Sequence, residues 1–229
     1  MIFTGAVAIS DDGSSLNNNS LLKTGLEYTS MFDCPVITHS EDESLVEDGV
    51  MHEGAVSAML GMKGRPAVAE DIAVARDLML AQYADAKIHI AHVSSKGTVE
   101  LIRQAKRKGI KVTAEATPHH LTLTDEAVRS FDTATKVNPP LRSADHVAAL
   151  IEGLQDGTID AIATDHAPHA FEEKDMEYKQ APPGFTGMET ALGVVLTGLY
   201  HTGKLTLLEL VERMSTAPAR ILGLESGVL

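Results

Sequence analysis

Residues 87–116 read KIHIAHVSSKGTVELIRQAKRKGIKVTAEA, and this stretch predicts the fold. Its two ends are rich in β-branched and apolar residues, which is typical of strands. Between them, Lys96 to Lys108 carries apolar side chains at helical spacing and is followed by Gly109, a residue suited to the left-handed turn that ends many helices. Strand, helix and strand in this order form a βαβ unit, which indicates a parallel sheet covered by helices.

The same alternation extends along the chain in both directions. The predicted strands are Gly5 to Ile9, Pro35 to His39, Lys87 to His92, Ile110 to Ala116 and Asp160 to Thr164. The predicted helices are Leu21 to Phe32, Pro66 to Ala84, Lys96 to Lys108, Ala144 to Leu154, Met188 to Tyr200 and Leu205 to Ser215. Five βα units do not close an eight-stranded barrel. We therefore expect an α/β fold, a partial TIM-type (β/α)8 barrel, in one incomplete domain over residues 1–229.

Composition narrows the class of function. The chain has 229 residues, of which 44% are hydrophobic, enough for a sizeable core. The formal net charge of −13 argues against a nucleic-acid partner, because phosphate contacts need clustered Lys and Arg. The single cysteine, Cys34, cannot form an internal disulfide, and no apolar run of about 18 residues predicts a membrane span. We expect a cytoplasmic protein with a small-molecule substrate.

Four of the five predicted strands run directly into a side chain that can bind a metal ion. These side chains belong to Asp12, His39, His92 and Asp165. The C-terminal ends of parallel barrel strands converge on one face, so the four should meet around one site. Imidazole nitrogen with carboxylate oxygen is the ligand set expected for zinc, with manganese or cobalt as substitutes. Each residue alone is more often a satisfied structural group, so the metal prediction depends on the four together.

The other histidines lack this pattern. His89 lies three residues before His92, so the alternation of a strand places its side chain toward the helices. His119 and His120 are neighbours on a segment that we expect to be extended, where their side chains would point apart and would not share an ion. We expect a structural or supporting role for this pair. Three further histidines fall in loop or helical surroundings and are interpreted as solvated surface residues: His52, His146 and His201.

Two further regions combine polar side chains with a rigid backbone. They are KVNPPLRS at 136–143, and TDHAPH at 164–169 followed by APPGFTGMET at 181–190. A rigid loop explains the prolines, but it does not explain Asn138, Asp165 and His169 together. An amide, a carboxylate and an imidazole beside a metal site can recognise and protonate a small polar ring. The sequence therefore predicts a substrate site here.

Together these motifs resemble the dihydroorotases of the amidohydrolase superfamily, specifically the bacterial class in which an aspartate, and not a carboxylated lysine, bridges two metal ions. The resemblance covers essentially all 229 residues. The segments that carry it are ISDDG, THSED, MHEG, HIAHVSS, VTAEATPHHL, KVNPPLRS, DGTIDAIATDHAPH and GFTGMET.

The resemblance implies a role at the metal centre for each matching residue. Asp12 would bridge two zinc ions, and Asp11 beside it is the weaker candidate for that role. His39 and His92 would complete the coordination of one ion. Asp165 would ligate the other ion and transfer the proton.

The resemblance also implies the substrate and the residues that bind it. Asn138 and His169 would bind dihydroorotate, and the backbone around Pro183 and Gly184 would contact its pyrimidine ring. The implied reaction is the reversible hydrolysis of (S)-dihydroorotate to N-carbamoyl-L-aspartate, a step of pyrimidine biosynthesis.

Part of the family pattern has no match in the chain. A His-x-His pair, an arginine two residues after it and an asparagine that holds the substrate carboxylate would all precede Met1. The family also continues beyond Leu229. We therefore expect a chain truncated at both ends, without the N-terminal strands and a small β-rich domain. Such a chain would hold one zinc ion where a complete site holds two, and would hydrolyse dihydroorotate poorly or not at all.

Two other functions fit part of the pattern. A related cyclic amidase, such as an allantoinase or a dihydropyrimidinase, would share the fold and the metal site, although Asn138 and His169 in their settings favour dihydroorotate. A non-catalytic subunit that partners aspartate transcarbamoylase would explain the missing histidine pair, whereas the retained site residues favour descent from an active enzyme. A homodimer is the other assembly that we consider.

Overall fold

The computed structural model describes residues 1–228 and shows the predicted parallel sheet. Five strands lie in the order β1-β2-β5-β6-β7, and every neighbouring pair is parallel. Each overlaps a predicted strand, and all five are shorter than predicted. Their bounds are β1 Ile9–Ser10, β2 Val36–Thr38, β5 Ile88–Ile90, β6 Val112–Ala116 and β7 Ala161–Ile162.

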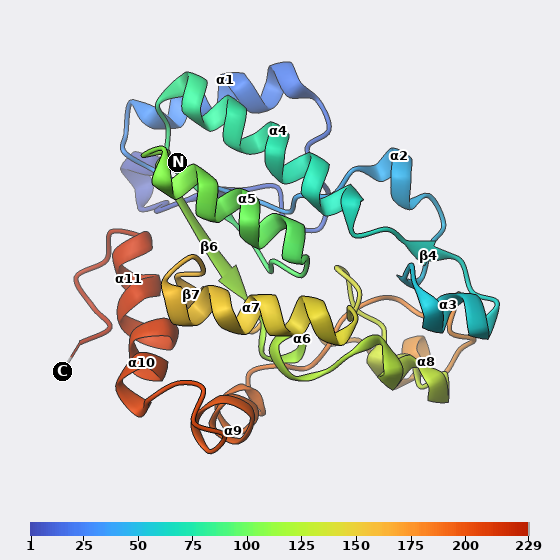
Figure 1. Cartoon of the computed structure of the whole chain (residues 1–229). Coiled ribbons are helices and arrows are strands. Elements are labelled where there is room, and N and C mark those ends of the chain that lie inside the picture. The colour runs from blue at the N-terminus through green and yellow to red at the C-terminus, as the bar shows by residue number, and fades with distance from the viewer. Residues whose placement is uncertain (229) are drawn as a thin grey trace.

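Four longer helices lie in a row along one face of this sheet (Figure 1). They are α1 Asn19–Ser30, α4 Val68–Ala84, α5 Lys96–Arg107 and α7 Ala144–Asp156. The shorter helices are α2 Glu43–Val46, α3 Ala55–Leu60, α6 Pro118–Thr122, α8 Phe171–Lys174, α9 Ala191–Val195, α10 Leu207–Val211 and α11 Ala217–Ile221. The helices α9 and α10 continue into π-helical turns at Leu196–Tyr200 and Glu212–Thr216. Among residues 1–228, no helix combines the length and the apolar character needed to cross a membrane.

The main core lies between the sheet and this row of helices. Ile88 and Ile90 of β5 are each 1% exposed and belong to one cluster with Leu78 of α4 and Ile102 of α5. Burial of such a side chain contributes about 1.5–3 kcal/mol. The apolar positions that predicted the βαβ unit are therefore the ones that join its layers.

His89 lies on the opposite face of the sheet from this core, so the prediction that it faces the helices is wrong. Its Nδ1 is 2.8 Å from Thr113 Oγ1, and its Nε2 is 3.1 Å from Glu115 Oε2. Strand alternation failed because His92 lies beyond the last residue of β5 with a φ of 32°. This left-handed conformation breaks the two-residue repeat.

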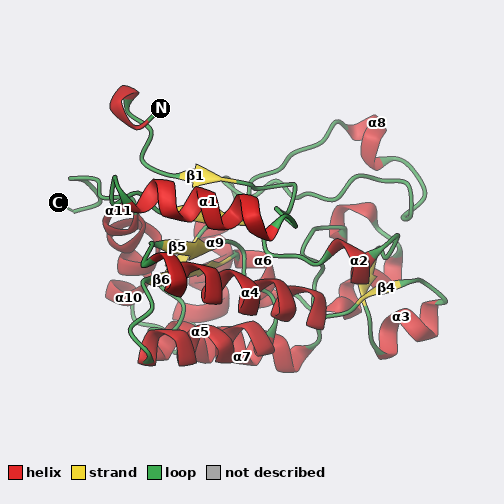
Figure 2. Ribbon diagram, turned by 90° about the horizontal axis from the view of Figure 1, so that it is seen from above, coloured by secondary structure: helices red, strands yellow, loops and turns green. Residues whose placement is uncertain are grey.

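The chain between β2 and α4 forms a small second sheet that the sequence analysis did not predict. Its strands, β3 Met51–His52 and β4 Gly64–Arg65, pair in parallel. They lie with α2 and α3 at one end of the molecule (Figure 2). This end has its own small core of buried residues, made of Met51, Val56, Val128 and Tyr178.

A buried network of charged side chains joins the small sheet to the main one. Arg142, which is 3% exposed, donates from Nη1 to the carbonyl oxygen of Arg65 at 2.9 Å and from Nε to Ser94 Oγ at 3.0 Å. Glu70 of α4 accepts the backbone N–H groups of Ser94 and Ser95, each at 3.0 Å, and lies 3.6 Å from Arg142 Nη2. Each buried charge depends on the other to offset lost hydration. The network thereby fixes both β4 and the loop after β5.

His52 and His146 are buried beside this network, so the prediction that they are surface residues is wrong. His52 Nδ1 accepts from Arg142 Nη1 at 3.3 Å, and His146 Nδ1 accepts the Lys96 N–H at 3.0 Å. The two rings meet edge to face with centroids 5.3 Å apart. His201 is exposed, as predicted.

Acid should weaken folding through His52. Burial, and then the positive charge of Arg142, lower its pKa from 6.5 to about 4. The unfolded chain therefore binds a proton before the folded chain does, so the contribution of His52 is full above pH 6.5 and is lost as the pH falls toward 4. His52→Asn keeps an acceptor for Arg142 without this titration. The free energy of unfolding of both proteins should fall between about pH 7.5 and pH 5. The fall in His52→Asn should be smaller than that in the wild type by about 1–2 kcal/mol.

Urea unfolding at the two pH values measures this difference. His201→Asn is the matched control, because it removes an exposed histidine and should follow the wild type. An equal fall in the free energy of unfolding of His52→Asn and of the wild type would contradict the prediction.

Candidate active site

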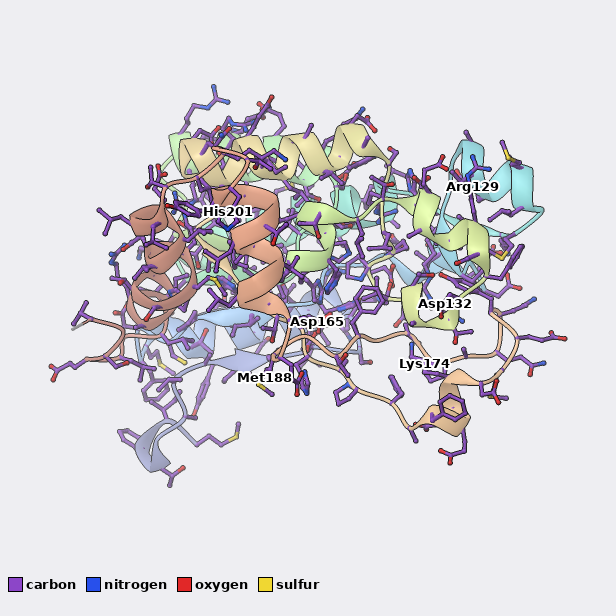
Figure 3. All side chains as sticks on the ribbon, turned by 90° about the horizontal axis from the view of Figure 1, so that it is seen from below. Arg129, Asp132, Asp165, Lys174, Met188 and His201 are labelled. Atoms are coloured by element: carbon purple, nitrogen blue, oxygen red, sulfur yellow. The ribbon has the colours of Figure 1, made fainter. Side chains whose placement is uncertain are left out.

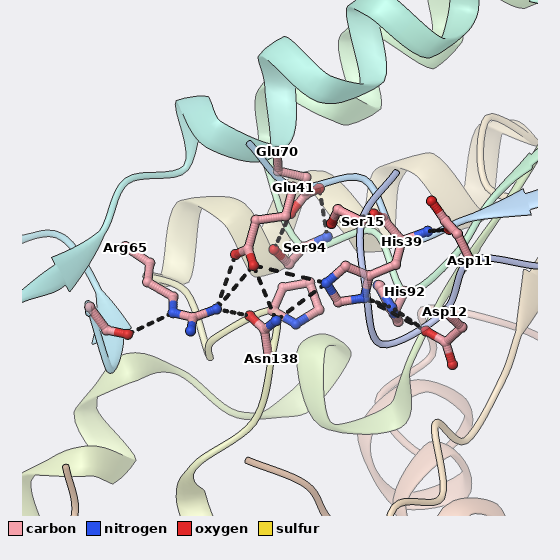
Figure 4. A network of polar contacts seen from close by, with 12 residues as sticks. Asp11, Asp12, Ser15, His39, Glu41, Arg65, Glu70, His92, Ser94 and Asn138 are labelled. Atoms are coloured by element: carbon pink, nitrogen blue, oxygen red, sulfur yellow. Dashed lines mark hydrogen bonds and ion pairs between the residues drawn. The ribbon is translucent and has the colours of Figure 1, made fainter. Parts of the chain in front are cut away.

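Asp12, His39 and His92 meet at the carboxyl ends of β1, β2 and β5 (Figure 4). His39 Nδ1 and His92 Nε2 are 2.8 Å apart. Asp12 Oδ1 lies 3.6 Å from His39 Nδ1 and 3.3 Å from His92 Nε2. Both rings are buried, whereas the Asp12 side chain is exposed. The group is thus enclosed by protein on the histidine side and open to a ligand on the aspartate side.

The geometry of this three-residue group fits a divalent metal ion. Tetrahedral zinc with ligand bonds of about 2.0–2.1 Å places neighbouring ligand atoms roughly 3.3 Å apart. The three separations between donor atoms here run from 2.8 to 3.6 Å. Small shifts of the side chains are enough to bring all three atoms to one ion.

The electrostatics of the group also favour a cation. The neighbouring imidazoles of His39 and His92 lower the pKa of Asp12. Burial opposes protonation of His39, but the nearby carboxylates of Asp12 and Glu41 outweigh it and raise the pKa of His39 to about 9. The group therefore attracts positive charge, which either a proton or a metal ion can supply.

Asp11 does not share this group, which favours Asp12 as the ligand. Asp11 Oδ1 accepts the backbone N–H of His39, and Oδ2 accepts that of Leu16, each at 2.8 Å. Both oxygens are engaged by backbone. Asp11 thereby ties the loop after β1 to the end of β2 and positions His39.

Asp165 lies at the end of β7, near the middle of Figure 3, and is not part of the three-residue group. Burial raises the pKa of its carboxyl, and the next-largest influence is the opposing charge of His92. Asp165 and His92 also share a left-handed backbone, with φ of 48° and 32°. Such conformations cost free energy in residues other than glycine and gather at functional sites.

Glu41, Arg65 and Asn138 surround the side of the His39 ring that faces away from Asp12. Asn138 Nδ2 is 3.3 Å from His39 Nε2 and 3.2 Å from Glu41 Oε2. Glu41 Oε2 is in turn 3.9 Å from His39 Nε2. A carboxylate behind a metal-binding histidine orients its ring, and Glu41 occupies that place.

Sequence reasoning missed both Glu41 and Arg65. Burial acts to raise the pKa of Glu41, but the neighbouring His39 ring and the charge of Arg65 lower it overall, so Glu41 is a carboxylate. Its position in THSED, two residues after His39, was an available signal. Arg65 offered none, because it reaches the site from the unpredicted strand β4.

His169, Pro183 and Gly184 lie together on the loops after β7. His169 Nε2 donates to the carbonyl oxygen of Pro183 at 2.9 Å. Gly184 has a φ of 146°, and a Cβ there would lie 2.4 Å from a backbone carbonyl oxygen, so only glycine fits. Its N–H donates to the carbonyl oxygen of Lys136 at 2.9 Å, which joins this loop to the segment that carries Asn138.

Two cavities adjoin these residues. One, of about 230 Å³, is lined by Arg65, Asn138 and Pro183 among others. The other, of about 430 Å³, is lined by His169 and Gly184 among others. The larger cavity lies within the size range typical of small-molecule sites.

His119 and His120 lie on α6, outside the three-residue group. His120 Nε2 donates to the carbonyl oxygen of Pro139 at 2.9 Å, and its Nδ1 is 2.8 Å from Thr117 Oγ1. His120 therefore supports the segment that carries Asn138, in agreement with the supporting role predicted for it. The expected extended backbone is wrong, because α6 begins at Pro118.

The three-residue group should bind one divalent ion tightly per chain. His92→Ala removes one of the three ligands and should lower the affinity for zinc by at least about 100-fold, more than the loss of a supporting residue costs. His201→Ala is the control, since it removes an exposed histidine elsewhere. Isothermal titration with zinc and the visible absorption of bound cobalt measure the affinity. Two tightly held zinc ions per chain, or unchanged affinity in His92→Ala, would contradict the prediction.

Comparison with known proteins points to one family. The family model described as Dihydro-orotase-like matches residues 2–98. The dihydroorotase of Pelotomaculum thermopropionicum is 58% identical over 98% of this chain and 53% of its own length. The dihydroorotase of Pelobacter propionicus is 56% identical over 98% of this chain and 53% of its own length. The chain thus spans about half the length of the curated relatives it matches.

Solved structures share the fold. The L-hydantoinase (dihydropyrimidinase) from Arthrobacter aurescens matches 100% of this chain and 54% of its own with a TM-score of 0.87 at 29% identity. The dihydropyrimidinase from Brevibacillus agri NCHU1002 matches 96% of this chain and 51% of its own with a TM-score of 0.80. At 23% identity, this second likeness concerns the fold alone. The predicted partial barrel is confirmed, and the chain belongs to the dihydroorotase family of amidohydrolases.

Proposed function

We propose that this chain supplies a metal-binding and proton-transferring part of a dihydroorotase, which reversibly hydrolyses (S)-dihydroorotate to N-carbamoyl-L-aspartate in pyrimidine biosynthesis. One observation carries the proposal. Asp12, His39 and His92 converge at the strand ends of a chain that is 58% identical to a dihydroorotase.

The same three residues would hold the cation, which we propose to be zinc. A carboxylate and two imidazoles are donors that suit it. A divalent cation held there supplies Lewis acidity, which activates water and polarises an amide carbonyl. A complete site with two zinc ions bridged by Asp12 is part of the same proposal, and Asp165 would be a ligand of the second ion.

Asp165 is proposed to move the proton. The reaction forms a carbon–oxygen bond at the amide carbonyl and breaks the bond from that carbon to the ring nitrogen. Asp165 would take a proton from the attacking water and deliver it to the departing nitrogen. Burial, which raises the pKa of this carboxyl, helps it to hold the proton between the two events.

Asn138, His169, Pro183 and Gly184 are proposed to hold the substrate, in the two cavities that they line. The amide and imidazole groups suit carbonyl and carboxylate oxygens. Dihydroorotate is favoured over the hydantoins, because identity reaches 58% with a dihydroorotase and 29% with the hydantoinase. A cytoplasmic location enters the proposal from the composition of the chain, and assembly as a homodimer or with aspartate transcarbamoylase enters it through the family resemblance alone.

When the chain is joined to a segment that supplies the family's His-x-His pair, Asp165→Asn should lower kcat for dihydroorotate by roughly 100- to 10,000-fold, the range of acid–base catalysis. Asp175→Asn is the control, since it removes an exposed carboxylate from a nearby loop and should keep kcat within about twofold. A spectrophotometric assay with added zinc measures both. Retained kcat in Asp165→Asn would contradict its role, and hydrolysis of hydantoin but not of dihydroorotate would contradict the proposed substrate.

A further inference from the structure

Arg65 reaches from the small β3–β4 sheet to Asn138. Its Nη1 donates to Asn138 Oδ1 at 2.6 Å and to Glu41 Oε2 at 3.0 Å, while its Nε donates to the carbonyl oxygen of Gly49 at 2.7 Å (Figure 4). Its own carbonyl oxygen accepts from buried Arg142 at 2.9 Å. Both the backbone and the side chain of Arg65 are therefore held in place.

These contacts decide which way the amide of Asn138 points. A guanidinium only donates hydrogen bonds, so the amide atom 2.6 Å from Arg65 is the oxygen. The carboxylate of Glu41 only accepts, so the amide atom 3.2 Å from it is the nitrogen. Although the two amide atoms have nearly the same shape, both neighbours give one assignment. The donor end of Asn138 therefore faces His39, with Nδ2 3.3 Å from His39 Nε2.

Arg65 contributes to this orientation twice, because it donates to the amide oxygen and also holds the Glu41 carboxylate that accepts from the amide nitrogen. Within residues 1–228 it is the only side chain that donates to Asn138 Oδ1. Without it, the amide oxygen loses its donor and the Glu41 carboxylate loses its cation, so both contacts that orient the amide are weakened. An amide that turned over would present an acceptor where the present one presents donors.

We propose that Arg65 is a positioning residue for the reaction and acts through Asn138. It keeps the N–H groups of Asn138 toward the metal-binding group, so the substrate atom that meets Asn138 is a carboxylate or carbonyl oxygen and not a ring N–H. The cavity of about 230 Å³ that Arg65 lines with Asn138, Lys136 and Pro183 gives such an oxygen room and positive charge. This inference rests on the proposed function.

The first test reads the amide itself. Arg65→Met has a similar length and no donor, Arg65→Lys keeps the charge, and Lys63→Met removes an exposed cation two residues away that pairs with Glu47 and Asp48. Nitrogen–proton correlation spectra show the side-chain amide of Asn138, which is identified by its loss in Asn138→Asp. The signal should move away from its wild-type position in Arg65→Met and lie between these two positions in Arg65→Lys. It should keep its wild-type position in Lys63→Met. An unmoved signal in Arg65→Met would overturn the proposal.

The second test separates binding from turnover. With the chain joined to a segment that supplies the family's His-x-His pair, Arg65→Met should raise the KM for dihydroorotate roughly 10- to 100-fold, as for the loss of a charge-assisted hydrogen bond, while kcat changes less. The KM of Arg65→Lys should lie between those of the wild type and Arg65→Met. The KM of Lys63→Met should match that of the wild type. A fall in kcat at unchanged KM, or a loss of zinc affinity as large as in His92→Ala, would overturn the proposal. Inactivity on dihydroorotate even when the chain is joined to a segment that supplies the family's His-x-His pair would refute the proposed function, and the amide spectra would still decide the role of Arg65.

Discussion

The buried ion pair between Glu70 and Arg142 is the contact on which the arrangement of the site depends. The two residues are 4% and 3% exposed, and a buried charge that loses its partner costs about 3–5 kcal/mol. The pair also binds the loop after β5 through Ser94 and the strand β4 through the carbonyl oxygen of Arg65. Elements that approach the site from two directions are therefore fixed by one interaction.

Different neighbours hold the backbone and the ring of His39 in the metal-binding group. Asp11 fixes the backbone of His39 through a charge-assisted hydrogen bond. Glu41 and Asn138 lie beside Nε2 of its ring. The carboxylates give the group a surplus of negative potential, which a bound cation offsets. Orientation and charge are thus provided by different neighbours, so a change in one need not disturb the other.

Much of the fold and of the site could be predicted because both follow from regular repeats. Strand and helix periods identify the elements of the main sheet, and parallel strands bring their ends together whatever lies between them. The predictions that failed concern residues whose position depends on long-range contacts or on a local backbone turn, which no sequence repeat reveals. His52 is buried by Arg142, which is 90 residues away, and His89 changes face because the backbone turns at His92. The strand that carries Arg65 has two residues, too few to form a pattern.

The left-handed backbone at His92 also limits how this centre could be redesigned for another metal. Histidine, asparagine and aspartate enter the left-handed region more readily than other residues with a side chain, and His92 has a φ of 32°. Cysteine, whose thiolate would favour softer metals, carries no such preference. Metal selectivity at this position is therefore constrained by local conformation as well as by ligand chemistry, and a redesigned loop would have to accompany a new donor.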